Sequence, residues 1–284
     1  MTFACALVAH PTQIADAAVA ALLAEAELTP KPGLVDRCGR GAHTDMDLPL
    51  LRRAAEALRP WFAAFVAASR RRGEPSGELR RELAVLGRSA EADMLGATGG
   101  VNTHRGAIWA LGLLTAAVTL RVGTSDARSV AATAAAIARH PDRACPPEAL
   151  PSHGTRVRAA FGAHGARGQA RQGFPHVVEV GLPTLQAARL TGVSQETTRL
   201  TALLAIMATL DDTCVLYRGG RAGLRTVQGG AARVLRAGGP GTLRGRRLLD
   251  ALDQQLAGAR LSPGGCADLL AATLFLDSLD LAEA

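Results

Sequence analysis

"LTALLAIMATL", residues 200–210, decides the fold class, because it is apolar nearly all the way round a helix and is interrupted only by Thr201 and Thr209. A helix without a polar face is buried by its neighbours on every side. The composition agrees: alanine and leucine dominate, aromatic residues make up 3%, and β-branched residues rarely run together. We therefore predict an all-α protein with this segment at its centre.

Two aspartates, Asp211 and Asp212, follow this segment directly. Helical spacing puts Asp211 four residues after Met207 and three before Cys214, on an apolar face. A buried carboxylate has to be paired, hydrogen-bonded or metal-bound. Two interpretations stay open at this point: an ion pair with Arg218, or a Mg²⁺ site, since Mg²⁺ binds through carboxylates together with substrate phosphates.

The rest of the chain has the apolar spacing of further helices, separated by glycine and proline. The predicted helices span 11–27, 46–70, 78–95, 107–118, 125–139, 175–191, 197–216, 221–236, 244–258 and 262–280. The letters "VVEV" near the start of 175–191 leave a short strand as an alternative, and 140–154 is a proline-rich loop. The helices on either side of that loop are too apolar to stand apart, so we predict one helical domain over 1–284.

Charge and cysteine content restrict the class of partner. Lysine and arginine total 32 against 25 acidic residues, for a net charge of +7, and the longest basic run is Arg70–Arg72. Few aromatic residues are available for base stacking, so a phosphorylated small molecule is favoured over nucleic acid. Five scattered cysteines without a C-x-x-C motif, no membrane-length apolar run and no signal-peptide pattern predict a soluble cytoplasmic protein with reduced thiols.

Three residue types occur once each: Lys31, Asn102 and Tyr217. Residues that are rare under a strong compositional bias tend to persist where chemistry or geometry requires them. All three lie in segments rich in glycine and polar residues, 28–46, 96–106 and 211–220. Chance survival is the alternative, but the clustering favours a functional role.

The first segment, "LTPKPGLVDRCGRGAHTDM", holds Lys31 between two prolines and ahead of a glycine. Stiff backbone on both sides would fix one ammonium, a compact charge that suits a phosphate oxygen. Asp36, His43 and Asp45 follow. Capping of a helix near residue 46 by Thr44 or Asp45 is one interpretation of "GAHTDMD", and a ligand or metal role for His43 or Asp45 is the other.

Glycines precede two predicted helices. In "GATGGVNTHRG", exposed N–H groups, the helix dipole and Arg105 predict an anion site, although no Walker motif or dinucleotide-binding fingerprint is present. Asn102 and Thr103 are possible caps there, and His104 is a titratable donor. In "LSPGGCADLL", we expect Ser262 to be the N-cap and Pro263 the first helical residue. The following Gly264 and Gly265 would allow a ligand to approach the backbone.

Several classes are excluded by spacing. Isoprenoid synthases need D-D-x-x-D, and Val215 stands at the last position. No adjacent His-Asp pair, nucleophile elbow or zinc spacing is present. A nucleotide-binding regulatory helical module and a helical nucleoside hydrolase remain as alternatives to a transferase.

Five spaced motifs carry a resemblance to the triphosphoribosyl-dephospho-CoA synthase family: "EAELTPKPGLVDRCGRGAHTDM", "TGGVNTHRGAIWALGLL", "RGQARQGFPHV", "LDDTCVLYRGG" and "SPGGCADLLAATLFLD". The resemblance runs from about residue 11 to 280, and its wording is most similar to the malonate decarboxylase branch. One position departs from it: Gln169 stands where citrate-type relatives usually carry Glu, which argues against a catalytic role there.

This resemblance implies an all-helical enzyme that uses ATP as a ribosyl donor. The 2′-hydroxyl of 3′-dephospho-CoA attacks C1 of the ATP ribose, adenine leaves, and the product goes to a prosthetic-group transferase for an acyl-carrier subunit. A homodimer is a further expectation, and Mg²⁺ is expected with ATP. The roles expected of the candidate residues are metal or base for Glu25, Asp211 and Asp212; proton transfer for Asp36 and His43; phosphate binding for Lys31, Arg105, Arg218 and Arg221; and nucleotide pockets for Asn102, Thr103, His104, Ser262, Gly264 and Gly265.

Overall fold

The chain folds into an all-α structure. The computed structural model describes residues 11–121, 126–142 and 153–279, and these contain no β-strand. The helices are α1 Pro11–Ala26, α2 Leu48–Ala57, α3 Arg59–Arg72, α4 Gly77–Ala97, α5 Arg105–Leu120, α6 Ala127–Arg139, α7 His153–Phe161, α8 Gly165–Arg171, the π-helix η1 His176–Gly181, α9 Leu182–Leu190, α10 Gln195–Thr209, α11 Thr213–Arg236, α12 Leu243–Gly258 and α13 Gly264–Asp277.

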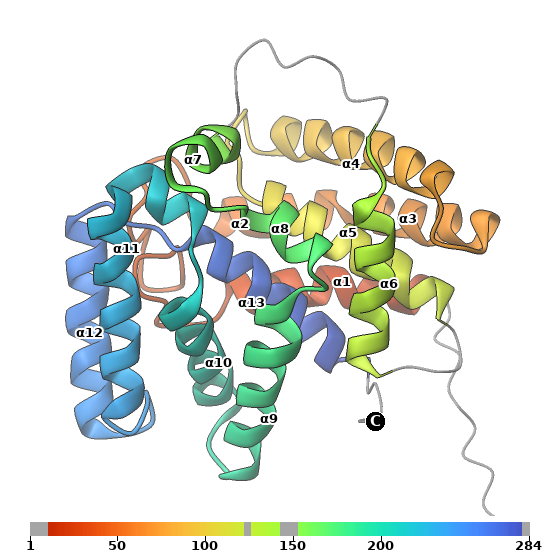
Figure 1. Ribbon diagram of the computed structural model, residues 1–284. Helices are drawn as coiled ribbons and strands as arrows, with labels where there is room; N and C mark the ends of the chain where they lie inside the picture. Colours follow the sequence, from red (N-terminus) through yellow and green to blue (C-terminus); the bar gives the residue numbers. More distant parts are fainter. Residues whose placement is uncertain (1–10, 122–125, 143–152, 280–284) are drawn as a thin grey trace, which may run out of the picture.

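α5 and α13 lie at the centre of the molecule. Both are strongly apolar and are buried almost all round, as helices without a polar face must be. α13 runs through the middle of the bundle and packs against α1, α5 and α10 (Figure 1). One hydrophobic cluster extends from Ile14 to Leu276, so the first and last described helices share a core.

The remaining helices surround this centre. α3, α4 and α6 lie on the α5 side, and α9 packs against α10. α11 and α12 form an antiparallel pair at the opposite edge of the molecule, with α7 against α11 (Figure 1). Helices from both sides of residues 143–152 contribute to the same cluster. The single-domain interpretation stays a prediction, since a shared core does not measure cooperativity.

Most predicted helices form, with the following main differences. Residues 46–70 make two helices, broken at Leu58 ahead of Pro60. The predicted helix 197–216 also breaks, because α10 ends at Thr209 and α11 begins at Thr213. The possible strand at "VVEV" is instead η1.

Two short helices, α7 and α8, were not expected from the periodicity. The predicted loop 140–154 falls mostly on residues 143–152, which lie outside the described residues.

Among the described helices, none taken singly has the length and apolarity needed to cross a membrane. α10 and α11 together meet a criterion of length and composition, but they are bent by 59° at the break between them.

Candidate functional site

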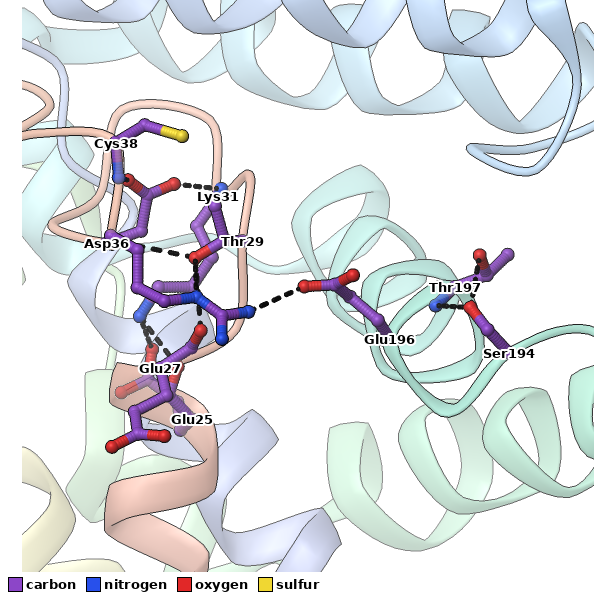
Figure 2. Close-up of polar contacts among 10 residues, drawn as sticks. Glu25, Glu27, Thr29, Lys31, Asp36, Cys38, Ser194, Glu196 and Thr197 are labelled. Carbon is purple, nitrogen blue, oxygen red and sulfur yellow. Dashed lines mark hydrogen bonds and ion pairs between the residues drawn. The ribbon is translucent and has the colours of Figure 1, made fainter.

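The loop between α1 and α2, residues 27–47, is organised by Asp36. Its carboxylate accepts hydrogen bonds from the backbone N–H groups of Lys31 at 2.9 Å and Cys38 at 2.7 Å (Figure 2). It also accepts one from the N–H of Gly39 at 3.1 Å. A buried aspartate that accepts nearby N–H groups replaces the hydrogen bonds that a helix or sheet would supply. Asp36, expected as a proton-transfer group, is therefore fully engaged in shaping this loop.

Lys31 lies inside the protein, not at its surface. Its ammonium donates to Glu25 twice, at 2.7 Å to the backbone oxygen and 2.7 Å to Oε1, and its side chain is 1% exposed (Figure 2). The two charges expected to hold a phosphate and a metal thus bind each other. Removing one partner of such a pair leaves the other charge buried and uncompensated.

Long-range contacts fasten this loop to the C-terminal half of the chain. The N–H of Gly33 donates to Asp253 of α12 at 2.9 Å. Arg37 forms an ion pair with Glu196 at the start of α10 (Figure 2). The loop is therefore held between α1, α10 and α12.

His43 connects the loop to two other predicted segments. Its Nε2 is 2.8 Å from the hydroxyl of Ser262, and its Nδ1 lies 3.4 Å from both Asp45 and Arg218. Burial, followed by the nearby Arg218 charge, lowers the pKa of His43 below 6.5, with Asp45 opposing this shift. His43 is thus a neutral imidazole at pH 7, held between a hydroxyl and a carboxylate.

Two expected caps are wrong here. Asp47 caps α2 by accepting from Leu50 N, in place of Thr44 or Asp45, because α2 begins two residues later than expected. Ser262 does not cap α13, whose N-cap position is Pro263. The Ser262 hydroxyl contacts His43 instead.

The buried aspartate after α10 is Asp212, and the expectation that Asp211 is buried is wrong. The helix break turns Asp211 outward, whereas Asp212 is 1% exposed. Asp212 caps α11 by accepting from Cys214 N at 2.7 Å and Val215 N at 3.2 Å. Its other oxygen accepts from Cys266 N at 2.8 Å, in the first turn of α13. One carboxylate therefore joins the N-termini of two helices.

Gly264 and Gly265 allow this junction to form. A Cβ on Gly265 would lie 3.0 Å from the Asp212 carboxylate, and one on Gly264 would lie 3.1 Å from the Cys214 sulfur. The close approach that these glycines permit is between α13 and the start of α11. Packing thus accounts for two residues that were expected to contact a nucleotide.

Asp268, one turn further along α13, was not singled out from the sequence. Its carboxylate lies against the first turn of α5, where a Cβ on Gly106 would be 2.0 Å from Oδ2. Burial, and then the neighbouring Glu25 and Asp212 carboxylates, raise the pKa of Asp268 well above its usual value. The signal in the sequence was a lone acid at the start of an otherwise apolar helix.

Residues 102–105 begin α5 and have separate roles. Asn102 accepts from Arg105 N at 3.3 Å, as a cap would. The hydroxyl of Thr103 is buried without a hydrogen-bond partner. His104 is buried, with Nε2 3.2 Å from the Leu51 oxygen, and Arg105 is exposed in an ion pair with Glu91. None of these four side chains forms a hydrogen bond with His43 or with its neighbours Asp45, Ser262 and Arg218.

The two arginines of α11 diverge. Arg218 reaches the backbone oxygens of Ala42 at 3.5 Å and Arg260 at 3.4 Å, beside His43. Arg221 points toward α7, with its guanidinium 5.9 Å from the centre of the Phe161 ring. Only Arg218 lies with the loop and the start of α13.

The donors expected for a metal are engaged elsewhere. Glu25 pairs with Lys31, Asp212 accepts three N–H groups, and Asp211 is exposed. Within the described ranges, no group of three or more His, Cys, Asp or Glu side chains is placed to hold an ion. The residues present do not fit a resident Mg²⁺ ion.

The site brings helix N-termini, buried carboxylates and one arginine together. The N-termini of α11 and α13 meet at Asp212, and Asp268 brings that of α5 alongside. Helix N-termini carry partial positive charge and free N–H groups. Arg218 adds a full positive charge at the same edge.

Comparison with known proteins gives a consistent set of relatives. Residues 11–284 match the model of a family described as ATP:dephospho-CoA triphosphoribosyl transferase. A protein of Stutzerimonas stutzeri (strain A1501), named probable 2-(5''-triphosphoribosyl)-3'-dephosphocoenzyme-A synthase, is 56% identical over 269 residues, covering 94% of this chain and 91% of that protein. Relatives of the same name from Azotobacter vinelandii (strain DJ) and Pseudomonas putida are each 53% identical, covering 94% and 95% of this chain and 91% and 97% of theirs. No solved structure gives a significant match.

Proposed function

The chain belongs to the ATP:dephospho-CoA triphosphoribosyl transferase family and is a transferase, and from this premise we propose that it moves the 5-triphosphoribosyl group of ATP to the 2′-hydroxyl of 3′-dephospho-CoA. The family match over residues 11–284 is the observation that carries the proposal. Arg218 at the edge of this site supports it, because the triphosphate needs an anchor of positive charge.

The reaction forms a bond between the acceptor 2′-oxygen and C1′ of the ATP ribose and breaks the bond from C1′ to the adenine nitrogen. The hydroxyl loses a proton and adenine gains one. His43 is the neutral base best placed to accept the first proton, because Asp45 and Ser262 hold its ring. Positioned proton transfer of this kind contributes roughly 10²–10⁴-fold to a rate.

Asp268 is our candidate donor of the proton to adenine. Burial and two neighbouring carboxylates raise the pKa of Asp268 well above its usual value, which favours the protonated form that a proton donor needs. The environments of His43 and Asp268 thus shift their pKa values in opposite directions, which is how enzymes assign one group as base and another as acid. Glu25 and Asp212 are the nearby negative charges that would stabilise positive charge developing on the ribose.

Mg²⁺ is proposed to enter with ATP as part of the substrate. The structure offers no preformed set of ligands in the described residues, so the ion would be held mainly by phosphate oxygens and water. Addition of EDTA to saturating chelation is therefore expected to abolish turnover while leaving the Tm of the protein without ATP unchanged. A large fall in that Tm would show a resident metal.

The same proposal includes the biological setting. The residues of the motifs "GGVNTHRGAIWALG" and "DTCVLYRGG" support the malonate decarboxylase branch. The product would then pass to a prosthetic-group transferase that loads the acyl-carrier subunit, and the protein would work in the cytoplasm, as a possible homodimer. Deletion of the gene tests this branch: loss of prosthetic-group loading on a malonate-type carrier, with loading of a citrate-type carrier in the same cells retained, is the expected result.

The central experiment incubates the protein with ATP, Mg²⁺ and dephospho-CoA and measures adenine by chromatography. Adenine release that requires both substrates is the expected result. Release from ATP alone would indicate a nucleoside hydrolase. Tight nucleotide binding without release would indicate a regulatory binding module.

A further inference from the structure

We propose that the hollow between α7 and α11 binds the adenosine half of the acceptor, with the adenine on the face of Tyr217 and the diphosphate near Arg156 and Arg221. The inference rests on the proposed function, because it takes dephospho-CoA as the acceptor. The hollow has a volume of about 250 Å³. Its lining residues are Arg156, Val157, Ala160, Phe161, Leu216, Tyr217 and Gly220.

The chemistry of the lining suits a nucleotide. It combines two aromatic rings with an arginine, and Arg221 lies over the Phe161 ring at its edge. None of these described lining residues is acidic. A second hollow of about 260 Å³, on α3 and α4, contains arginines too, but there they pair with Glu78 and Glu82. Of these two hollows, the one at α7 and α11 has no acidic lining residue to pair with its arginine.

Tyr217 has the geometry of a stacking platform. One face of its ring stacks on His153 with 3.8 Å between ring centres and 18° between planes. The side chain is nevertheless 44% exposed, which is unusual for a large aromatic residue that has a partner. His153 therefore holds the ring in place while part of it stays open. Bases stack on such rings with little dependence on sequence.

Gly220 lines this hollow at a kink in α11. Its backbone angles, φ 57° and ψ −158°, interrupt α11 in a region that residues with a side chain rarely adopt. A Cβ there would meet only Phe161, at 3.9 Å, so crowding does not explain the glycine. The conformation itself is what the chain requires at this point.

One residue of α11 connects the hollow with the proposed reaction centre along the chain. Arg218, next to Tyr217 in the chain, contacts the α1–α2 loop at Ala42 and approaches His43. The proposal requires a base stacked on Tyr217 to direct its own ribose, which carries the attacking 2′-hydroxyl, toward His43. The acceptor also has a long arm beyond its diphosphate, and exposed Arg156 marks an open side along which the arm can leave. ATP, a compact molecule with a triphosphate, fits the helix N-termini better.

The test compares Tyr217→Ala with Tyr217→Phe in the adenine-release assay. We expect Tyr217→Ala to raise KM for dephospho-CoA about tenfold or more, since stacking on one aromatic ring is worth that much to a base. KM for ATP should change less than about twofold, and kcat should stay the same. Tyr217→Phe keeps the ring and should behave like the wild type.

Arg156→Ser is a second variant, on an exposed residue whose loss does not threaten folding. It should raise KM for dephospho-CoA several-fold, whereas the matched control Arg81→Ser, from the other hollow, should not. A rise in KM for ATP instead, or no change in either KM, would overturn the inference. Failure of the proposed function looks different: the wild type itself would release no adenine.

Discussion

His43 is the residue whose chemistry is most open to measurement. It is held by Ser262 and Asp45, and burial lowers its pKa below 6.5. Above that pKa the imidazole is neutral and accepts a proton, and below it the imidazole is charged and cannot. We therefore expect kcat/KM to fall at acidic pH, with an apparent pKa under 6.5.

Replacement of this residue tests its role. His43→Gln should reduce kcat by roughly 10²-fold or more and remove the acidic limb of the pH profile. His164→Gln, on an exposed histidine of α8's N-cap position, is the control and should keep both. An unchanged pH limb in His43→Gln would assign the titration to another group.

Asp268 illustrates a cost of function to stability. Its pKa is raised in the folded protein by burial and by Glu25 and Asp212, so the folded state binds the proton more tightly than the unfolded chain. Its contribution to stability is complete below its usual pKa and is lost as pH rises through the folded pKa. Asp268→Asn, which cannot ionise, should therefore be more stable than the wild type at neutral pH.

The size of that difference should grow with pH from about pH 4 upward. Urea unfolding at several pH values measures it, and the same variant should lose adenine release. A stability difference that stays constant or shrinks with pH would contradict the raised pKa. An active variant would remove Asp268 from the proposed proton transfer.

Lys31 and Glu25 form the buried pair most sensitive to loss of one member. Lys31→Met should lower the free energy of unfolding by about 3–5 kcal/mol, because it leaves Glu25 charged and unpaired. Adding Glu25→Gln should recover most of this loss, which a double-mutant cycle in urea would show. A loss of under about 1 kcal/mol in the single variant would mean that water reaches Glu25.

At the scale of elements, Gly220 is the position where α11 depends on a glycine. Gly220→Ala should lower the free energy of unfolding by about 1–3 kcal/mol, since alanine is strained at φ 57°. Gly87→Ala is the matched control: Gly87 also lies in a helix, but a Cβ there meets nothing within 4 Å. It should be neutral or stabilising by up to about 1 kcal/mol. Equal effects in thermal unfolding would show that the kink relaxes.

Helix periodicity predicted most elements, and its failures occur where a polar side chain or proline ends a helix. Continuing the apolar spacing of α10 through Asp211 put the wrong aspartate inside. Asp212 ends that periodicity because its carboxylate binds the N–H groups of α11 and α13, and half of this requirement comes from a distant residue, Cys266. Periodicity alone contains no information on such a partner.

At the scale of the molecule, the core predicts one cooperative unit. The hydrophobic cluster joins helices from both sides of residues 143–152. We expect a single unfolding transition, with far-ultraviolet circular dichroism and tryptophan fluorescence coincident in urea. Trp61 and Trp109 both report on α3 and α5, so a second domain would separate the two signals. Transitions that do not coincide would show that the chain contains more than one unfolding unit.

The segments that form the site were easier to predict from the sequence than the roles of their residues. Residues 28–46, 211–220 and 262–265 do meet, through His43, Arg218 and Ser262. Rarity identified Lys31 but could not show that its partner is Glu25, six residues earlier, because both interpretations need the same stiff loop. Asp268 was missed because its neighbour, Gly106, belongs to a helix 162 positions away in the chain.

The packing of α13 against α1 and α5 has a consequence for how the protein is made. One oxygen of Asp212 finds its partner, the N–H of Cys266, only after α13 has been synthesised. Until then, the apolar faces of α1 and α5 that pack against α13 stay exposed, and exposed apolar surface promotes association with other chains. A nascent chain arrested before residue 264 should accordingly depend on chaperones and show no adenine release, whereas a chain that includes α13 can complete the junction at Asp212.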